Sequence, residues 1–237
     1  MRHQLLGFVI ALALATPAAA QTPWSVSFNV GGDISLSGDV HDGGLGRVQT
    51  LPTAVGARTY GDVHGTPLFW SADLGYGLGQ RGEARARLLR SSGSASRVQV
   101  GTVASLPLFA QFSDWDAWGV DFGYRQYLRG SGIRPFVGGN VGFLAVDANS
   151  GTFTVPEASV TLPNVSMTGN STVPIASLAG GAEWPLNQRL SLVGSVDFRW
   201  QGNLDPVDGL AGTGLERIND RTRRWSMPVT AGAAVRF

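Results

Sequence analysis

Cysteine and lysine are missing from the 237-residue sequence, and charged residues of any kind are few. Without cysteine, the chain can form no disulfide and can offer no thiolate for catalysis. Charged residues make up 15% of the chain, the net charge is +1 and all 18 basic residues are Arg, which argues against a nucleic-acid partner. Long apolar runs are also missing beyond residue 20, which excludes helical membrane spans in that part. What remains is long enough for one β-rich domain.

The amino-terminal residues have the pattern of a secretory signal. Arg2 and His3 precede an apolar run over residues 5–14, and small residues follow at 16–20. The run is shorter than the roughly 20 residues that span a bilayer, which disfavours an uncleaved membrane helix. We therefore expect residues 1–20 to be a cleaved signal peptide and residues 21–237 to be the mature domain, either a soluble β-protein or a membrane barrel.

Alternation with a period of two dominates the mature chain. In residues 70–78, apolar side chains at every second position alternate with Ser, Asp and Gly, as in a strand with one apolar face. The same pattern recurs along the chain, and we therefore expect eight strands. They lie at 24–30, 70–78, 84–88, 118–124, 137–143, 178–186, 190–200 and 225–237.

The connections between these strands alternate between short and long. Tight turns fall at 79–82, 129–132 and 187–188, and long segments at 39–66, 91–116, 147–173 and 202–224. This alternation is typical of outer-membrane barrels, with short turns on the periplasmic side and longer loops outside. The predicted fold class is therefore all-β, a transmembrane antiparallel up-and-down β-barrel of eight strands. Alternating patches at 98–100 and 153–155 are compatible with ordered hairpins above the membrane or with mobile loops.

Aromatic residues give an independent test, because a barrel in lipid carries aromatic girdles at both water interfaces. The proposed strands put one group at the loop end, Trp70, Trp118, Phe143, Trp200 and Trp225, and one at the turn end, Trp24, Tyr76, Tyr124, Trp184 and Phe237. Trp115 falls in a loop. A soluble sandwich would not sort aromatics to strand ends. Pro228 fits less well, because it removes a ladder bond inside the last strand or marks a bulge.

Three segments resemble a known group of small barrels. Residues 134–142, residues 180–192 and the terminal Val-Arg-Phe237 are similar to the outer-membrane protein A, outer-membrane protein W and opacity-protein group. The resemblance implies an eight-stranded barrel in the outer membrane and says little about activity. It also implies that Phe237, which closes the last alternating strand, is the assembly signal for the barrel assembly machinery.

Charged residues recur at positions that face the lumen. Eight strands enclose a space that side chains just fill, so we expect these charges to pair across the lumen and block it. A narrow ion path is the alternative. The predicted lumen charge network comprises Asp33, Asp73, Glu83, Arg85, Arg87, Asp121, Arg125, Glu183, Asp197, Arg199 and Arg236.

Histidines are the candidates for chemistry. His41 and His64 lie in duplicated Gly-Asp-Val-His tetrapeptides, and neither is followed by Ser at the spacing of the deacylating small barrels. We therefore predict no enzyme and no cofactor. Pairing Trp24 with about Gly79 would set the two tetrapeptides side by side. Two imidazoles and two carboxylates there could bind a divalent metal, and the favoured alternative is two solvated strand extensions. The weak candidate ligands are Asp39, His41, Asp62 and His64.

Arg221, Arg223 and Arg224 cluster just before the last predicted strand. Arg forks bind phosphate in a bidentate way, so the cluster is a candidate contact for lipopolysaccharide, with a solvated loop as the alternative.

The function predicted from these features is a surface-interaction, adhesion or envelope-integrity role for a barrel with a filled lumen. A small-solute channel of the outer-membrane protein W kind is the alternative, and a lipid A-modifying enzyme is a weaker one. The expected partners are outer-membrane lipid, lipopolysaccharide, the barrel assembly machinery, and host or surface ligands bound by the outer loops. The expected location is the outer membrane.

Overall fold

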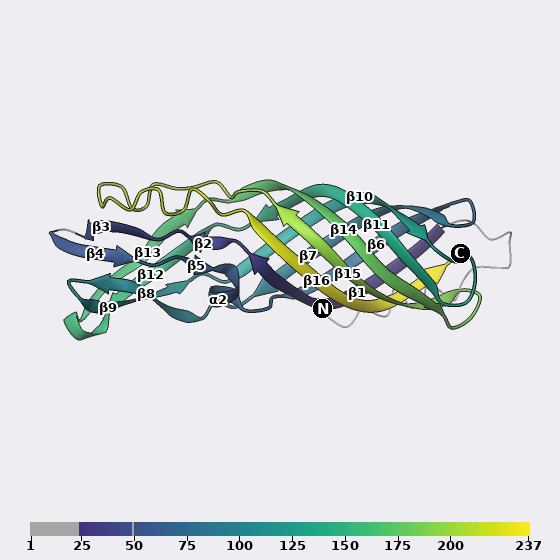
Figure 1. The fold of residues 1–237 in the computed structure, drawn as a ribbon, viewed down its shortest axis with the longest axis horizontal. Helices are drawn as coiled ribbons and strands as arrows, with labels where there is room; N and C mark the ends of the chain where they lie inside the picture. Colours follow the sequence, from purple (N-terminus) through teal and green to yellow (C-terminus); the bar gives the residue numbers. More distant parts are fainter. Residues whose placement is uncertain (1–23, 49) are drawn as a thin grey trace, which may run out of the picture.

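Eight long antiparallel strands close into a barrel in the computed structural model, which describes residues 24–48 and 50–237. Neighbours in the barrel follow the order of the chain, and β1 pairs with β16 to close the ring (Figure 1). The strands are β1 (Trp24–Ser37), β6 (Leu68–Leu78), β7 (Gly82–Gly93), β10 (Trp115–Tyr127), β11 (Arg134–Val146), β14 (Ser171–Pro185), β15 (Leu190–Gln201) and β16 (Arg224–Arg236). The predicted fold class is confirmed. The predicted signal peptide at 1–20 and the predicted start of the mature chain at residue 21 lie outside the described residues.

The two ends of the barrel differ as the spacing of the strands predicts. Three short turns join β6 to β7, β10 to β11 and β14 to β15 at one end, which we call the turn end. The long connections leave the opposite end, which we call the loop end. β16 runs unbroken through Pro228, but its ladder with β15 stops at Val196↔Val229 and resumes at Arg199↔Ser226. The proline therefore interrupts pairing without shortening the strand.

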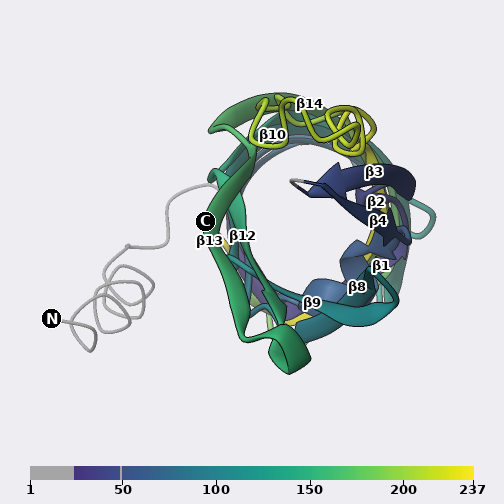
Figure 2. The ribbon, with the colours of Figure 1, turned by 90° about the vertical axis from the view of Figure 1, so that its left-hand side faces the viewer.

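The long connections form ordered structure beyond the loop end (Figures 1 and 2). We call this region the loop tier, and it comprises residues 38–48, 50–67, 94–114, 147–170 and 202–223. It contains β2 (Asp39–His41), β3 (Gly44–Val48), β4 (Leu51–Val55), β5 (Arg58–Thr59), α2 (Tyr60–His64), β8 (Arg97–Val103), β9 (Leu106–Phe112), β12 (Asn149–Val155), the 3-10 helix η1 (Pro156–Ala158) and β13 (Val160–Thr168). Six of these strands form one sheet in the order β13-β12-β9-β8-β4-β3, and β2 pairs with β5. Ordered hairpins, one of the two alternatives, are therefore what the structure shows.

Segment 202–223, between β15 and β16, connects the two edges of the six-stranded sheet. On one side the backbone N–H of Arg47 in β3 donates to the carbonyl of Thr213 at 2.7 Å. On the other side the N–H of Val207 donates to the carbonyl of Met167 in β13 at 3.1 Å. The sheet and this segment thus surround a common interior, as the end-on view in Figure 2 shows.

An apolar layer separates the lumen of the barrel from the loop tier. The short helix α2 begins at a capping box in which Thr59 and Asp62 satisfy each other's backbone N–H groups. It buries Tyr60 and Val63, which belong to the same apolar cluster as the inward-facing Leu89 and Leu144 near the loop end of the barrel. No helix in the described part of the chain is long and apolar enough to cross a membrane.

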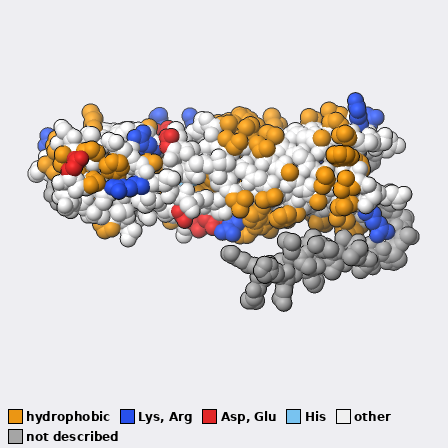
Figure 3. Space-filling model, turned by 90° about the horizontal axis from the view of Figure 1, so that it is seen from below, with side chains coloured by type: hydrophobic (Ala, Val, Ile, Leu, Met, Phe, Trp, Pro, Cys, Tyr) orange, Lys and Arg blue, Asp and Glu red, His pale blue; other side chains and the backbone are white. Residues whose placement is uncertain are grey.

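Hydrophobic side chains cover the outside of the barrel wall, gathered in two bands (Figure 3). At the turn end Trp24 packs edge-on against Tyr76, with ring centroids 4.8 Å apart. At the loop end Trp70 meets Trp118 at 5.1 Å. The predicted sorting of aromatics to strand ends is confirmed, except that Trp115 is not a loop residue. It begins β10, points inward and donates from its indole nitrogen to Ser91 at 3.1 Å.

Candidate functional site

The charged side chains that the sequence assigns to the lumen all lie inside the barrel and contact one another. Alternation along each strand places them there, because every second residue faces inward. They form three layers along the barrel, and each layer contains both signs of charge.

The layer nearest the loop end is centred on Asp33 of β1, which is completely buried. Arg199 of β15 lies 2.5 Å from its carboxylate and Arg224 of β16 lies 3.4 Å away. The hydroxyl of Ser91 in β7 donates to the same carboxylate at 2.9 Å. One acid therefore holds side chains from three other strands.

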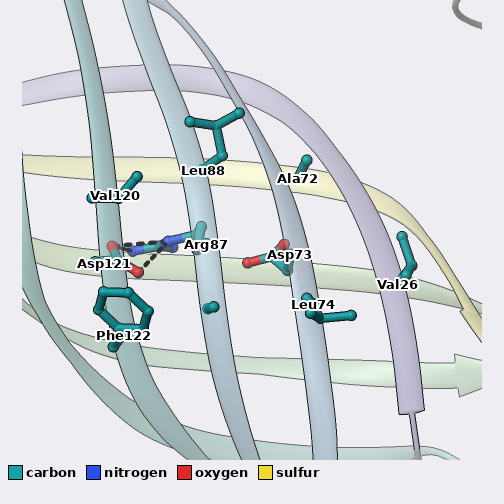
Figure 4. Close-up of a pocket in the computed structure, with 10 residues that line it drawn as sticks. Val26, Ala72, Asp73, Leu74, Arg87, Leu88, Val120, Asp121 and Phe122 are labelled. Atoms are coloured by element: carbon teal, nitrogen blue, oxygen red, sulfur yellow. Dashed lines mark hydrogen bonds and ion pairs between the residues drawn. The ribbon is translucent and has the colours of Figure 1, made fainter.

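The middle layer spans the full width of the lumen. Arg87 of β7 grips Asp121 of the neighbouring β10 through Nε and Nη2, at 3.0 and 2.6 Å (Figure 4). Its remaining nitrogen, Nη1, reaches Asp197 at 2.8 Å. Asp197 lies on β15, which is four strands away in a ring of eight and so stands opposite β7. Beside this bridge, Arg85 lies 2.5 Å from Asp73.

The layer at the turn end is centred on Glu183 of β14. Arg134 approaches it to 2.6 Å and Arg236 to 2.8 Å. The hydroxyl of Tyr127 donates to the same carboxylate at 2.8 Å. Arg125 lies 3.7 Å from Glu83 in this layer.

Arg224 corrects one prediction. Its position beside Arg221 and Arg223 predicts a lipopolysaccharide contact, but its side chain is buried and forms an ion pair with Asp33. β16 begins one residue earlier than predicted, so the inward alternation includes Arg224. Arg221 and Arg223 are exposed, and their contact with lipopolysaccharide stays a prediction.

Sequence reasoning also missed Arg134 and Tyr127 as members of the lumen network. Arg134 is the first residue of β11 and Tyr127 the last residue of β10, so both lie at the edge of a predicted turn. Their inward direction follows from the alternation only once the strands are extended to their true ends.

The predicted register of the two Gly-Asp-Val-His repeats is wrong. β1 pairs with β6 so that Trp24 faces Tyr76, three residues short of Gly79. Asp39 and His41 lie in β2, which pairs with β5, whereas Asp62 and His64 lie in helix α2. Asp62 serves as the helix cap. Among residues 24–48 and 50–237, no three His, Asp or Glu side chains gather as metal ligands would.

Each of the two described histidines is buried and bonded to a backbone carbonyl. His64 Nε2 pairs with the carbonyl of Ser113 at 3.2 Å, and the ring packs between Tyr60 and Trp115. Burial, together with the positive charge of Arg224, lowers the pKa of His64 to about 4. The ring is therefore neutral at physiological pH and acts as part of the apolar layer.

The closed barrel defines the fold of the chain. It is the fold of the small, eight-stranded outer-membrane β-barrels. Neisserial surface protein A superposes with a TM-score of 0.51 at 10% identity, covering 92% of this chain and 100% of that chain. Ail, the attachment invasion locus protein of Yersinia pestis, gives 0.47 at 10% identity, with 92% and 100% covered. The outer-membrane protein OprG from Pseudomonas aeruginosa gives 0.45 at 11% identity, with 92% and 98% covered. No protein-family model matches the chain, and no curated protein matches it in sequence.

Proposed function

We propose that the protein resides in the outer membrane and presents the loop tier at the cell surface, in an adhesion, surface-interaction or envelope-integrity role. The observation that carries the proposal is the ordered β-structure of the loop tier above a lumen that is filled with paired charges. An ordered sheet presents a fixed surface to a partner, so binding does not have to order mobile loops first.

The contents of the lumen support a barrel that does not conduct ions. The bridge from Arg87 to Asp121 and Asp197 crosses from one wall to the opposite wall. Above it lies the apolar layer that includes Tyr60 and Leu144. An ion that moves along the axis would have to break buried ion pairs and then cross this apolar layer, and both steps are costly.

The burial of the histidines disfavours an acyl-transferring or lipid A-modifying site. His41 and His64 are inside the loop tier, and neither lies on the lipid-facing wall where a lipid substrate would arrive. This supports a non-enzymatic role.

Single-channel recording in planar bilayers tests the closed lumen. We expect no steady conductance from the unmodified protein. A steady current would contradict this part of the proposal and favour the small-solute channel of the outer-membrane protein W kind.

A surface assay tests the role of the loop tier. A Gram-negative host that lacks its own small surface barrels would express the full chain or a variant in which hairpins β8–β9 and β12–β13 are replaced by short turns. We expect the full chain to increase adherence to epithelial monolayers, self-aggregation or resistance to detergent, and the variant to lose that gain while its barrel still folds. A full chain that is folded in the membrane and changes none of these properties would contradict the proposal.

A further inference from the structure

The loop tier contains an apolar cavity of about 70 Å³. Its wall comes from several separate segments of the chain, including Val55 of β4, Leu108 of β9, Val155 of β12, and Leu215 and Ile218 of segment 202–223. These five side chains are buried. The cavity is therefore an interior feature of the loop tier, distinct from the polar lumen below it.

One side of the cavity is open. Val160 and Leu162 of β13 line it, yet they are 51% and 42% exposed. The residues between and after them on β13 are exposed as well, so this end of the strand is covered on neither face. Apolar side chains that face a cavity and remain in contact with water gain free energy when an apolar ligand covers them.

His41 supplies a polar group in this apolar wall. The residue is 1% exposed and lines the cavity. Its Nδ1 lies 2.9 Å from the carbonyl oxygen of Asp42. A carbonyl oxygen only accepts hydrogen bonds, so Nδ1 carries the proton and Nε2 is left as an acceptor. Nε2 is buried and has no hydrogen-bond partner.

Nε2 is the ring nitrogen that a ligand could use. Since Nδ1 is bonded to the backbone of the next residue, Nε2 is left to accept a hydrogen bond from a ligand in the cavity that His41 lines. Burial, assisted by the positive charge of Arg58, lowers the pKa of His41 below its ordinary value. The ring is thus neutral at pH 7. The other polar side chain of the wall, Thr53, already donates to the carbonyl of Leu51 at 3.3 Å.

We propose that this cavity binds a small apolar molecule that carries one hydroxyl group, a cyclic or short-chain alcohol or a phenol, whose O–H donates to Nε2 of His41. A hydrocarbon of the same shape fills the cavity but leaves Nε2 unpaired. A carboxylate has no proton to donate at neutral pH and must lose its water on entry. The inference rests on the proposed function only in that the loop tier is the region presented for binding, and it names the ligand class.

A titration of purified protein in lipid nanodiscs tests the proposal, with empty nanodiscs as the reference for partition into lipid. The probes are cyclohexanol, methylcyclohexane and cyclohexanecarboxylate, and ligand-observed NMR measures their binding. We expect saturable binding of cyclohexanol, about fivefold tighter than that of methylcyclohexane because one neutral hydrogen bond is gained. We expect no saturable binding of the carboxylate.

Two variants and one control locate the site. H41F removes the acceptor and keeps an aromatic ring, so cyclohexanol should lose its advantage over methylcyclohexane. L162W fills the exposed mouth and should abolish binding of both probes. L106W adds the same side chain at the start of β9, outside the cavity and 36% exposed, and should leave binding unchanged.

Three results would each overturn the proposal: H41F still prefers cyclohexanol over methylcyclohexane as strongly as the unmodified protein does, L162W binds the probes as before, or the unmodified protein shows no saturable binding. L162W alters an exposed position, so it decides the matter even if H41F does not fold. Since binding is measured on purified protein, a failure here is separate from a failure of the adherence assay.

Discussion

At the scale of single residues, an Arg–Asp ion pair contributes differently to stability inside the lumen and on the outer wall of the barrel. Arg87 and its two acids are buried, whereas Arg90 pairs with Asp116 on the outer wall, where their side chains are 34% and 30% exposed. Both arginines belong to β7, so they form a matched pair for mutation.

Replacing Arg87 with Ala should lower the free energy of unfolding by about 3 to 5 kcal/mol, because Asp121 and Asp197 would stay buried without their cation. Arg90→Ala should cost about 1 kcal/mol or less, because this pair lies near the rim of the outer wall and is about a third exposed. Urea unfolding in lipid vesicles, followed by the heat-dependent shift in gel mobility, measures both. Equal losses for the two variants would contradict a dry charge network.

The pH response of His64 is a second prediction at this scale. The folded ring has a pKa of about 4, whereas an unfolded histidine titrates near its ordinary value of 6.5. Between these values the unfolded state binds the additional proton, so the free energy of unfolding of the apolar layer falls as the pH drops from 6.5 towards 4. The loss approaches about 3 kcal/mol at pH 4.

Hydrogen exchange at residues 60–65, compared at pH 7 and pH 5 after correction for intrinsic rates, checks this prediction. Protection should fall at pH 5 in the unmodified protein and change little in His64→Phe. The Asp62 cap does not confound the comparison, because its bonds to Thr59 hold the pKa of that carboxyl below its ordinary value. The same loss of protection in both proteins would show that another group titrates.

At the scale of elements, period-two alternation decides which face of each strand meets lipid. In β6, Leu74 points outward and is 46% exposed, whereas Ser71 points into the lumen and is 2% exposed. Figure 4 shows Leu74 near Val26, and Leu88 beyond Ala72 on the neighbouring strand, in a hollow on the barrel wall. The outer face is therefore apolar because it meets lipid, and the inner face is polar because it meets the charge network of the lumen.

Leu74→Arg should therefore cost about 2 to 4 kcal/mol and reduce assembly, because the cation would face the hydrocarbon near the middle of the bilayer. Ser71→Ala should cost about 1 kcal/mol, because it removes the hydroxyl that donates to Asp73 at 3.3 Å. The amount of heat-modifiable barrel in membranes measures assembly. Equal tolerance at the two positions would contradict the assigned faces.

Alternation also explains how far the sequence predicts these elements. Period two is a local property, so the barrel strands and tight turns could be predicted from it. Val55, Leu108 and Val155 were assigned to loops because their apolar partners come from other parts of the loop tier, and no local pattern records that contact. The sequence predicts that Arg87 pairs with an acid across the lumen, but it does not predict that this acid is Asp197. The stagger of the strands decides which charges meet across the lumen.

At the scale of the whole molecule, the barrel closes where its two ends meet. The last strand pairs with the first along most of its length, and the N–H of Phe237 donates to the carbonyl of Trp24 at 3.0 Å beyond the end of β16. Phe237 therefore lies at the seam where the last strand of the chain pairs with the first.

Deleting Phe237 should leave export intact and lower the amount of assembled barrel. The reason is that the terminal aromatic of an alternating strand resembles the signal that directs outer-membrane assembly. Fractionation and heat-dependent gel mobility measure the two quantities separately. Unchanged membrane levels and unchanged mobility would count against this role.

Segment 202–223 links the completion of the loop tier to the closure of the barrel. It runs between β15 and β16, and its backbone hydrogen bonds to β3 and to β13 join the two edges of the six-stranded sheet. The hairpins of the loop tier precede this segment in the chain, so an intermediate in which β16 is not yet paired with β1 would lack the side of the common interior that segment 202–223 provides. A molecule that stalls before this step would expose Val55 and Leu215 to water. We therefore expect a reagent that recognises the completed surface of the loop tier to distinguish assembled molecules from such intermediates.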